Sequence, residues 1–515
     1  MQHTPARRLL AGLAVAGAVI GMSSAPAFAA PKAADIAIIL TDVTVPIGET
    51  GALFGPLFYA DEQVSVEDPT ITYELSDGLT GVRLSEGDGV GDCESASPTK
   101  LVCSSWMPLE IGPELFGGYF DAALVAGETA EPGATGTVTA TFSGTDLDPV
   151  TSQFKVRVAE AVDLTAGAPT TVQASPGQSF DTTYAVSNSG DKAINGPSAF
   201  FFNDWAFESD EQYSNCLYAD GELQSCTFDE TLEPGSSWET TMSYKLRADT
   251  MAPGHEAGEA RWVTEAELED FYQYAEQLGV EKGTPGTGDE LSLDEAAAKR
   301  AQRAPQADKN PEDNWSYVDV EVTGKNGADL AAVGSAVTGK AGDEVKATAG
   351  VRNVGKATVD LSRAGFPAAV TQVQAPEGTS FVAAPDVCAE REGRPYIYEC
   401  YSDYIFKAGE EETYEFVLHI DRVVPNAKGL VAVNEPCECE RFTGDINKAN
   451  NRAAILVNKT AGNGGGTGGG DGGDDPTLPI TGPAGASLAV GGLVLLGLGA
   501  AAVMFTRRRR PAVKS

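Results

Sequence analysis

Apolar and polar positions alternate in short runs along most of the chain between residues 30 and 460. The clearest run has its inward-type positions at Phe180, Thr182, Tyr184 and Val186 and ends at an Asn-x-Gly turn beginning at Asn188. A period of two places these side chains on one face of a β-strand. Glycine and proline, 58 and 29 residues, separate the runs and are typical of turns between short strands. The pattern predicts a mainly β protein made of β-sandwiches.

The cysteines and glycines of these runs repeat at fixed offsets. Six cysteines form pairs ten, ten and twelve residues apart, namely Cys93 and Cys103, Cys216 and Cys226, Cys388 and Cys400. A glycine follows each second cysteine by nine residues, at Gly112, Gly235 and Gly409. The offsets indicate an internal repeat of domain size in three copies, which suits a mature chain of roughly 450 residues.

The copies also begin and end alike. Asp35, Asp163 and Asp329 each lie thirteen or fourteen residues before a glycine, and residues 308–314 resemble residues 445–451. The first copy is the most divergent, since it lacks both asparagine motifs. The predicted domains are the first sandwich at 30–160, the second at 161–325 with a helical insert at 264–305, and the third at 326–459.

The second and third copies resemble the Ig-like repeat domains of bacterial envelope and adhesion proteins. The resemblance lies in the early strand ending in Asn-x-Gly, the cysteine pair in mid-domain and the late turn rich in Asp and Asn, at Asn188, Asn353, Asn314 and Asn451. It implies an antiparallel sandwich of about seven strands. A ligand does not follow from the fold.

The insert of the second copy is predicted to contain two helices. The first begins with a capping box at Thr264 and Glu267, carries Leu268 and Ala275 on one face, and ends at Gly279. The second is expected to begin at Ser292 and end before Pro305. The insert is either a decoration packed on the sandwich edge or a binding platform.

All eight cysteines lie in the part predicted to be secreted, so disulfides are expected. Each repeated pair should bond within its own copy, because each sits at one offset from the same glycine. Cys437 and Cys439 belong to the third copy, where four cysteines allow three pairings. Disulfide chemistry is favoured there over a metal site, because no histidine lies near.

Catalytic motifs are scarce. The chain has three histidines, and His255 begins a zinc-protease-like pattern that lacks its second histidine. Oxygen-bearing residues at alternate positions make Asp308, Asn310, Asp445 and Asn447 weak calcium candidates, but tight turns held by Asn and Asp explain the same pattern. The prediction is therefore a protein without enzymatic activity, cofactor or bound metal.

The two ends of the chain carry targeting signals. Residues 1–29 combine Arg7 and Arg8, a short apolar stretch and an Ala-Phe-Ala cleavage site, the pattern of a secretory signal peptide. Residues 460–477 form a Gly-rich linker with nine glycines between Gly462 and Gly473. Residues 478–515 follow, with an apolar run at 483–505 and four arginines at 507–510. That run matches the thickness of a bilayer, so a transmembrane helix is predicted in the precursor.

Residues 478–515 resemble the cell-wall sorting signal of Gram-positive LPxTG surface proteins, the substrates of sortase. The fixed positions are Leu478, Pro479, Thr481 and Gly482. The resemblance implies cleavage between Thr481 and Gly482 and covalent transfer of Thr481 to peptidoglycan, with the sortase supplying the nucleophile. A plain single-span membrane anchor is the alternative. A lipid-anchor signal of the GPI kind fits poorly, because it ends in its apolar tail.

The net charge of the chain limits the classes of partner that can be expected. The formal charge is −38, and removing the two basic ends makes the mature chain about −45. Such a surface repels nucleic acid, so none is expected as a partner. The predicted partners are sortase, peptidoglycan and an unidentified extracellular ligand. The chain is interpreted as a secreted, wall-anchored stalk or adhesion module, with a surface hydrolase or cation-dependent binding protein as the alternative.

Overall fold

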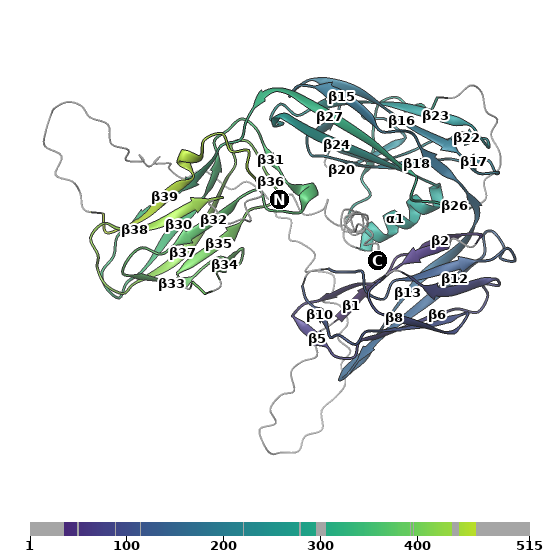
Figure 1. Cartoon of the computed structure of the whole chain (residues 1–515), viewed down its shortest axis with the longest axis horizontal. Coiled ribbons are helices and arrows are strands. Elements are labelled where there is room, and N and C mark those ends of the chain that lie inside the picture. The colour runs from purple at the N-terminus through teal and green to yellow at the C-terminus, as the bar shows by residue number, and fades with distance from the viewer. Residues whose placement is uncertain are drawn as a thin grey trace, which may run out of the picture.

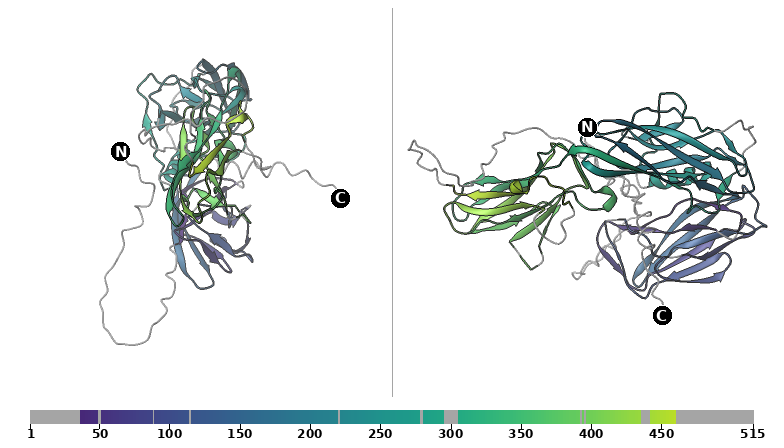
Figure 2. Two further views of the ribbon diagram at one scale, coloured as in Figure 1. Left: turned by 90° about the vertical axis from the view of Figure 1, so that its left-hand side faces the viewer. Right: turned by 45° about the horizontal axis from the view of Figure 1, so that its top comes forward.

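The computed structural model describes residues 36–459, except residues 49–50, 88, 114, 220, 278–279, 295–304, 392, 395 and 435–441. Strands dominate this part of the chain, and it contains one α-helix, α1 (Glu265–Gln277). The strands gather in three bodies that follow one another along the chain (Figures 1 and 2). The predicted fold class, tandem Ig-like β-sandwiches with a helical insertion in the second, is confirmed.

The second sandwich pairs two main sheets. One has the order β14 (Leu164–Ala166), β16 (Ser179–Asn188), β23 (Ser237–Leu246), β19 (Phe207–Ser209). The other has the order β15 (Thr170–Ala174), β27 (Trp315–Asn326), β24 (Ala252–Val263), β18 (Ser198–Asn203), β21 (Glu222–Thr227), β20 (Cys216–Ala219), β25 (Thr284–Pro285). A short pair joins β17 (Ile194–Asn195) to β22 (Thr231–Leu232).

The third sandwich repeats this order strand for strand, except that β25 has no counterpart. Its first sheet is β28 (Leu330–Val333), β30 (Glu344–Asn353), β37 (Glu411–Ile420), β33 (Thr379–Ala383). Its second sheet is β29 (Ser335–Val337), β39 (Arg452–Val457), β38 (Ala427–Val433), β32 (Val370–Gln374), β35 (Ile397–Tyr401), β34 (Cys388–Glu390). β31 (Val359–Asp360) and β36 (Ile405–Phe406) form the short pair. The order agrees with the repeat seen in the sequence.

The first sandwich has the same plan with one strand divided. Its larger sheet is β2 (Val43–Pro46), β13 (Leu147–Val162), β12 (Thr135–Gly144), β6 (Thr70–Leu75), β9 (Lys100–Ser104), β8 (Asp92–Ser97). Opposite it lie β3 (Ala52–Phe54), β11 (Ala122–Ala126) and β7 (Val82–Glu86), with separate pairs of β1 (Ile36–Ile39) with β4 (Leu57–Ala60) and β5 (Val64–Val66) with β10 (Leu109–Ile111). The counterpart of β16 is broken into β3 and β4 at Gly55 and Pro56, because proline cannot continue the ladder.

The sandwiches are antiparallel, as predicted, apart from one parallel pair of strands in each copy. The parallel pairs are β2 with β13, β15 with β27, and β29 with β39. In each copy the first stretch of chain forms two short strands, one in each sheet. The second of these strands runs parallel to the last strand of the same copy. This pairing covers an edge strand that would otherwise expose unpaired backbone groups.

Each sandwich closes over its own apolar core. Alternating strand positions supply the buried side chains, as predicted for Phe180 to Val186 on β16, where the four named positions are buried. Aromatic side chains fill the centres; Phe58 contacts Phe142 and Trp262 contacts Phe228, with ring centroids 4.9 and 5.8 Å apart. The alternation in the sequence therefore reports the core-facing side of each strand.

The insert matches the prediction in its first half only. Thr264 and Glu267 form the predicted capping box, with the Thr264 amide donating to the Glu267 carboxylate over 2.9 Å. The expected helix start at Ser292 is wrong, because residues 292 and 293 are not helical and Asp294 forms an antiparallel bridge with Glu239 of β23. The remainder of that predicted helix lies outside the described residues.

The sorting signal, the signal peptide and the Gly-rich linker all lie outside the described residues. Within the described part of the chain, no helix has the length and apolar character needed to cross a membrane. The predicted transmembrane run at 483–505 lies outside the described residues.

Candidate functional site

The repeated cysteine pairs are bonded as predicted. The disulfides join Cys93 to Cys103, Cys216 to Cys226, and Cys388 to Cys400. Each links directly opposite residues of two neighbouring strands and secures the strand β8, β20 or β34. Cys437 and Cys439 lie outside the described residues.

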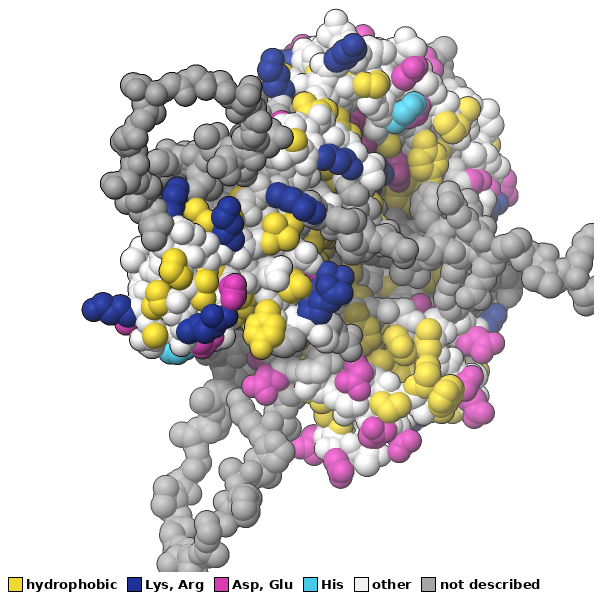
Figure 3. Space-filling view, turned by 60° about the vertical axis from the view of Figure 1, so that its left-hand side comes forward, with side chains coloured by type: hydrophobic (Ala, Val, Ile, Leu, Met, Phe, Trp, Pro, Cys, Tyr) yellow, Lys and Arg dark blue, Asp and Glu magenta, His cyan; other side chains and the backbone are white. Residues whose placement is uncertain are grey.

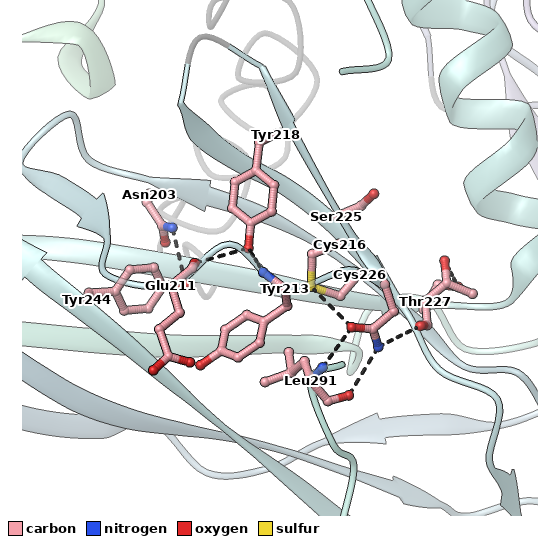
Figure 4. Close-up of a disulfide and its surroundings, with 12 residues drawn as sticks. Asn203, Glu211, Tyr213, Cys216, Tyr218, Ser225, Cys226, Thr227, Tyr244 and Leu291 are labelled. Atoms are coloured by element: carbon pink, nitrogen blue, oxygen red, sulfur yellow. Dashed lines mark hydrogen bonds between the residues drawn. A yellow bond between two sulfur atoms is a disulfide. The ribbon is translucent and has the colours of Figure 1, made fainter. Parts of the chain in front are cut away.

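Asn215, next to the second disulfide, anchors the insert (Figure 4). Beside Cys216, the Asn215 amide donates to the carbonyls of Thr227 and Leu291 over 3.1 and 3.0 Å and accepts from the Leu291 amide over 2.8 Å. Leu291 and Leu293 are buried in the core of the second sandwich. The insert is therefore part of this core, and its interpretation as a decoration on the sandwich edge is wrong for this segment.

The calcium candidates lie in turns closed by their own side chains. One Asp308 carboxylate oxygen accepts from the Asn310 amide over 2.6 Å and the other from the Leu164 amide over 2.6 Å. Asp445 accepts from the Asn447 amide over 3.0 Å. Among the residues that the structure describes, no group of three or more Asp, Glu, His or Cys side chains is arranged to hold a metal ion. The turn interpretation accounts for these contacts.

Two equivalent asparagines hold the repeated turns. The Asn188 side chain donates to the carbonyls of Lys192 and Leu232 over 2.7 Å each and accepts from the Gly190 amide over 3.0 Å. Its backbone carbonyl accepts from the Gly235 amide. Asn353 makes the corresponding bonds to Ala357, Phe406, Gly355 and Gly409. The glycine nine residues after the cysteine thus belongs to this turn, with φ of +77° and +81° at Gly235 and Gly409.

Helix α1 lies where the first and second sandwiches meet (Figure 1). Its buried face, with Leu268 and Tyr272, packs on Phe200 and Val263 of the second sandwich. From its other side Glu269 pairs with Arg157 of the first sandwich over 3.0 Å. Burial at this junction raises the pKa of Asp270 to about 6. The helix therefore contacts both sandwiches.

A strand pairing reinforces this junction. β13 continues out of the first sandwich and pairs in parallel with β26 (Gln306–Asp308), the segment that returns from the insert.

Next to α1 lies an open groove of about 500 Å³ whose lining includes Tyr272, Gln273, Glu276 and Lys282. The groove gives the insert the concave surface that its interpretation as a binding platform requires.

An arginine of the third sandwich makes several contacts across the junction with the second. Arg363, in the short 3₁₀ turn η1 (Ser362–Ala364) of the third sandwich, reaches the second sandwich. Its guanidinium pairs with Asp204 and Glu259 and donates to the carbonyls of Phe202 and Ala257 over 2.8 and 2.9 Å. Both carboxylate side chains are nearly buried, at 10% and 13% exposure. The carboxylates are thus largely desolvated and multiply bonded, while the arginine side chain keeps 30% exposure.

A protonated carboxyl accompanies this pair. Burial, with the neighbouring Asp204 charge, raises the pKa of Glu256 to about 9. Burial also raises the pKa of Asp204, against the opposing charge of Arg363. Glu256 therefore holds a proton at neutral pH beside Asp204, which pairs with the guanidinium.

Further contacts surround the arginine. Thr358 of the third sandwich donates from its hydroxyl to the Asp249 carboxylate over 2.6 Å and from its amide to the Asp249 carbonyl over 2.7 Å. The Trp205 ring faces Arg247 at 4.5 Å and Lys407 of the third sandwich at 5.9 Å. A cavity of only about 40 Å³ remains between Met251, Glu256, Thr358 and their neighbours. The junction is packed, and the remaining space suits about one water molecule.

The proton on Glu256 predicts a pH dependence. The unfolded state releases this proton near pH 4.5, whereas the folded state keeps it to about pH 9. Stability is therefore greatest below pH 4.5 with respect to this group and falls as the pH rises towards 9. We expect the urea midpoint of the mature chain to fall between pH 6 and 9, and Glu256→Gln to reduce the fall. Exposed Glu344→Gln is the control, and an equal slope in all three proteins would contradict the assignment.

Comparison with known proteins adds little to this description. No known family and no curated protein matches the chain. Among solved structures, a putative membrane-anchored protein from Corynebacterium diphtheriae covers 83% of this chain and 89% of its own, at 12% identity and a TM-score of 0.15. Titin domains I67–I69 cover 84% and 100%, at 7% identity and a TM-score of 0.16. A type I cohesin–dockerin complex from Clostridium thermocellum covers 25% and 99%, at 9% identity and a TM-score of 0.18. Likenesses this weak carry no functional argument.

The class of protein follows from the chain itself. Disulfides persist in oxidising compartments, and each of the three sandwiches contains one. The chain is an extracellular protein of tandem Ig-like β-sandwich modules. Its sandwiches are joined by packed junctions at α1 and at Arg363.

Proposed function

We propose that the protein is a sortase-anchored cell-wall surface protein whose sandwiches form a stiff stalk outside the cell. The observation that carries the proposal is the order of Leu478-Pro-Ile-Thr-Gly482, an uncharged run of 23 residues and four arginines. An apolar helix stopped by arginines holds the pentapeptide just outside the membrane. Pro479 keeps Leu478 extended, which is the form a peptide groove can bind.

The junctions support the stalk. Two sandwiches joined by a flexible linker would move independently, as is usual where interfaces are small and polar. Here β13 runs without a break from the first sandwich towards the second, and Arg363 fixes the third sandwich against the second. Such joints transmit orientation from one sandwich to the next, which suits a stiff stalk.

The alternative, a surface hydrolase or cation-dependent binding protein, gains no support from the buried carboxylates. Asp204 and Glu259 are occupied by Arg363, and the adjoining cavity is about 40 Å³. A hydrolase would need paired carboxylates facing a cleft that admits substrate. We therefore propose a non-enzymatic role, with no cofactor.

Substitution of Thr481 tests the anchoring. In the native host, Thr481→Ala is expected to move most of the protein from the wall fraction to the membrane fraction or the medium, because the acyl-enzyme forms at this residue. Ile480→Ala, at the variable position of the pentapeptide, is the matched control and should remain wall-bound. A muralytic enzyme should release the unaltered protein with a peptidoglycan fragment on Thr481. Wall binding of Thr481→Ala equal to that of the control would overturn the proposal.

A further inference from the structure

The first sandwich exposes a tryptophan at its free end. Trp106, in the loop between β9 and β10, is 84% exposed, and its neighbour Met107 is 38% exposed. The other tryptophans are less exposed; Trp238 and Trp262 are buried, and Trp205 and Trp315 are partly buried. A tryptophan standing in water is unusual for a soluble sandwich, and large apolar side chains rimmed by polar ones mark interaction surfaces.

Further apolar side chains lie in neighbouring segments, of which Phe116 and Tyr119 are partly buried against the core of the sandwich. Asp92 pairs with Ser104, which brings Val90, 43% exposed, close to the Trp106 loop. Val90 bridges Tyr119, whose ring lies 5.9 Å from that of Phe116. We call Val90, Trp106, Met107, Phe116 and Tyr119 the Trp106 strip.

The charge of the first sandwich is polarised along its strands. Residues 30–160 hold 21 acidic and five basic residues. Four of the bases lie in the described part, at the end of the sandwich opposite the Trp106 strip. On β9, Lys100 at one end pairs with Glu74, and Ser104 at the other end precedes the strip. The remaining positions follow from the pairing of Arg83 with Val125, Lys155 with Thr137 and Arg157 with Thr135.

Acidic residues approach the strip from two neighbouring segments. The Ser105 amide donates to the Pro69 carbonyl over 3.1 Å, which places Asp68 and Glu67 beside the loop. Asp92 lies opposite Ser104 on β8. In the face shown in Figure 3, acidic side chains likewise surround the hydrophobic ones that gather on the first sandwich.

We propose that the Trp106 strip binds a cationic partner, a protein surface or segment rich in arginine or lysine. An indole face attracts a guanidinium or ammonium group, most strongly when water is displaced. Surrounding carboxylates steer and retain such a partner, while the apolar side chains supply the buried area. The inference stands independently of wall anchoring, because it uses only contacts within the first sandwich.

Peptide binding tests the proposal. A tryptophan-free, dye-labelled peptide of alternating Arg and Ser is titrated into the mature chain at 150 mM salt, with the corresponding Glu–Ser peptide as comparison. We expect the Arg–Ser peptide to bind and to protect Trp106 from acrylamide quenching. Trp106→Ala should weaken binding about tenfold, and Asp68→Asn with Asp92→Asn should weaken it several-fold and reduce its salt dependence. Tyr396→Ala, at a 60% exposed aromatic of the third sandwich, is the matched control and should change nothing.

Four outcomes would overturn the proposal. Equal binding by Trp106→Ala and the unaltered chain would mean that the diffuse acidity of the protein attracts the peptide. Equal binding of the two peptides would mean that the strip takes an apolar partner regardless of charge. Absence of binding would remove the cationic partner altogether. Self-association in sedimentation that depends on Trp106 would make a second copy of the chain the occupant.

Discussion

Replacing Arg363 with methionine is expected to release the third sandwich from the second. Methionine keeps much of the aliphatic stem but removes the guanidinium that faces Asp204 and Glu259. Breaking a buried ion pair from one side leaves uncompensated charge and costs about 3–5 kcal/mol. The two carboxylates can be solvated only if water enters. The junction should therefore open while each sandwich keeps its own core. Small-angle scattering should then show a longer particle with more variable dimensions. In urea, the second and third sandwiches should unfold in separate transitions instead of a coupled one.

A second arginine provides the control for this prediction. Arg422 pairs with Glu377 over 2.6 Å within the third sandwich, but both side chains are about two-thirds exposed, at 65% and 68%. Exposed pairs contribute roughly 0–1 kcal/mol, so Arg422→Met should leave scattering and unfolding almost unchanged. Combining Arg363→Met with Asp204→Asn and Glu259→Gln should recover part of the lost coupling. If Arg363→Met behaved like Arg422→Met, the arginine would not hold the junction.

Local patterns in the sequence predict the sandwiches well. Period-two alternation identifies the buried face of β16, and the capping box identifies the start of α1. These signals are local because a strand or a helix cap is decided by residues a few positions apart. The cysteine offsets work for a related reason, since each disulfide joins strands that are adjacent in both sequence and space.

The junctions could not be predicted in the same way. Arg363 and Asp204 are 159 residues apart, and nothing in the immediate sequence distinguishes this arginine from the other basic residues. Its role depends on how two sandwiches meet, which is a property of tertiary packing. The insert shows the same limit at shorter range. Leu291 and Leu293 precede and overlap a helix-like stretch, yet they extend into the core because Asn215 binds the Leu291 backbone.

The role of the repeated asparagine could be predicted only in part from the sequence. The sequence indicates an Asn-x-Gly turn in two copies and a glycine after each cysteine pair, but it does not show that the two features meet. In the structure Asn353 binds the carbonyl of Phe406 and Gly409 binds that of Asn353. In the second and third copies, the shared offset between cysteine and glycine is therefore the length of chain needed to return to this turn.

Replacing Asn353 with alanine is expected to destabilise the third sandwich by about 3 kcal/mol, because each buried group left without a partner costs about 1–3 kcal/mol. Asn353 is fully buried, and its side chain serves the carbonyls of Ala357 and Phe406 and the amide of Gly355. Alanine removes these three bonds and a longer one, over 3.3 Å, from the Asp329 amide, without giving water access. Asn188→Ala should have a similar effect in the second sandwich, where the same bonds recur. Exposed Asn447→Ala is the control and should stay within about 0.5 kcal/mol. Urea unfolding measures the difference, and a loss below 1 kcal/mol for Asn353→Ala would show that the turn is held by its backbone bonds alone.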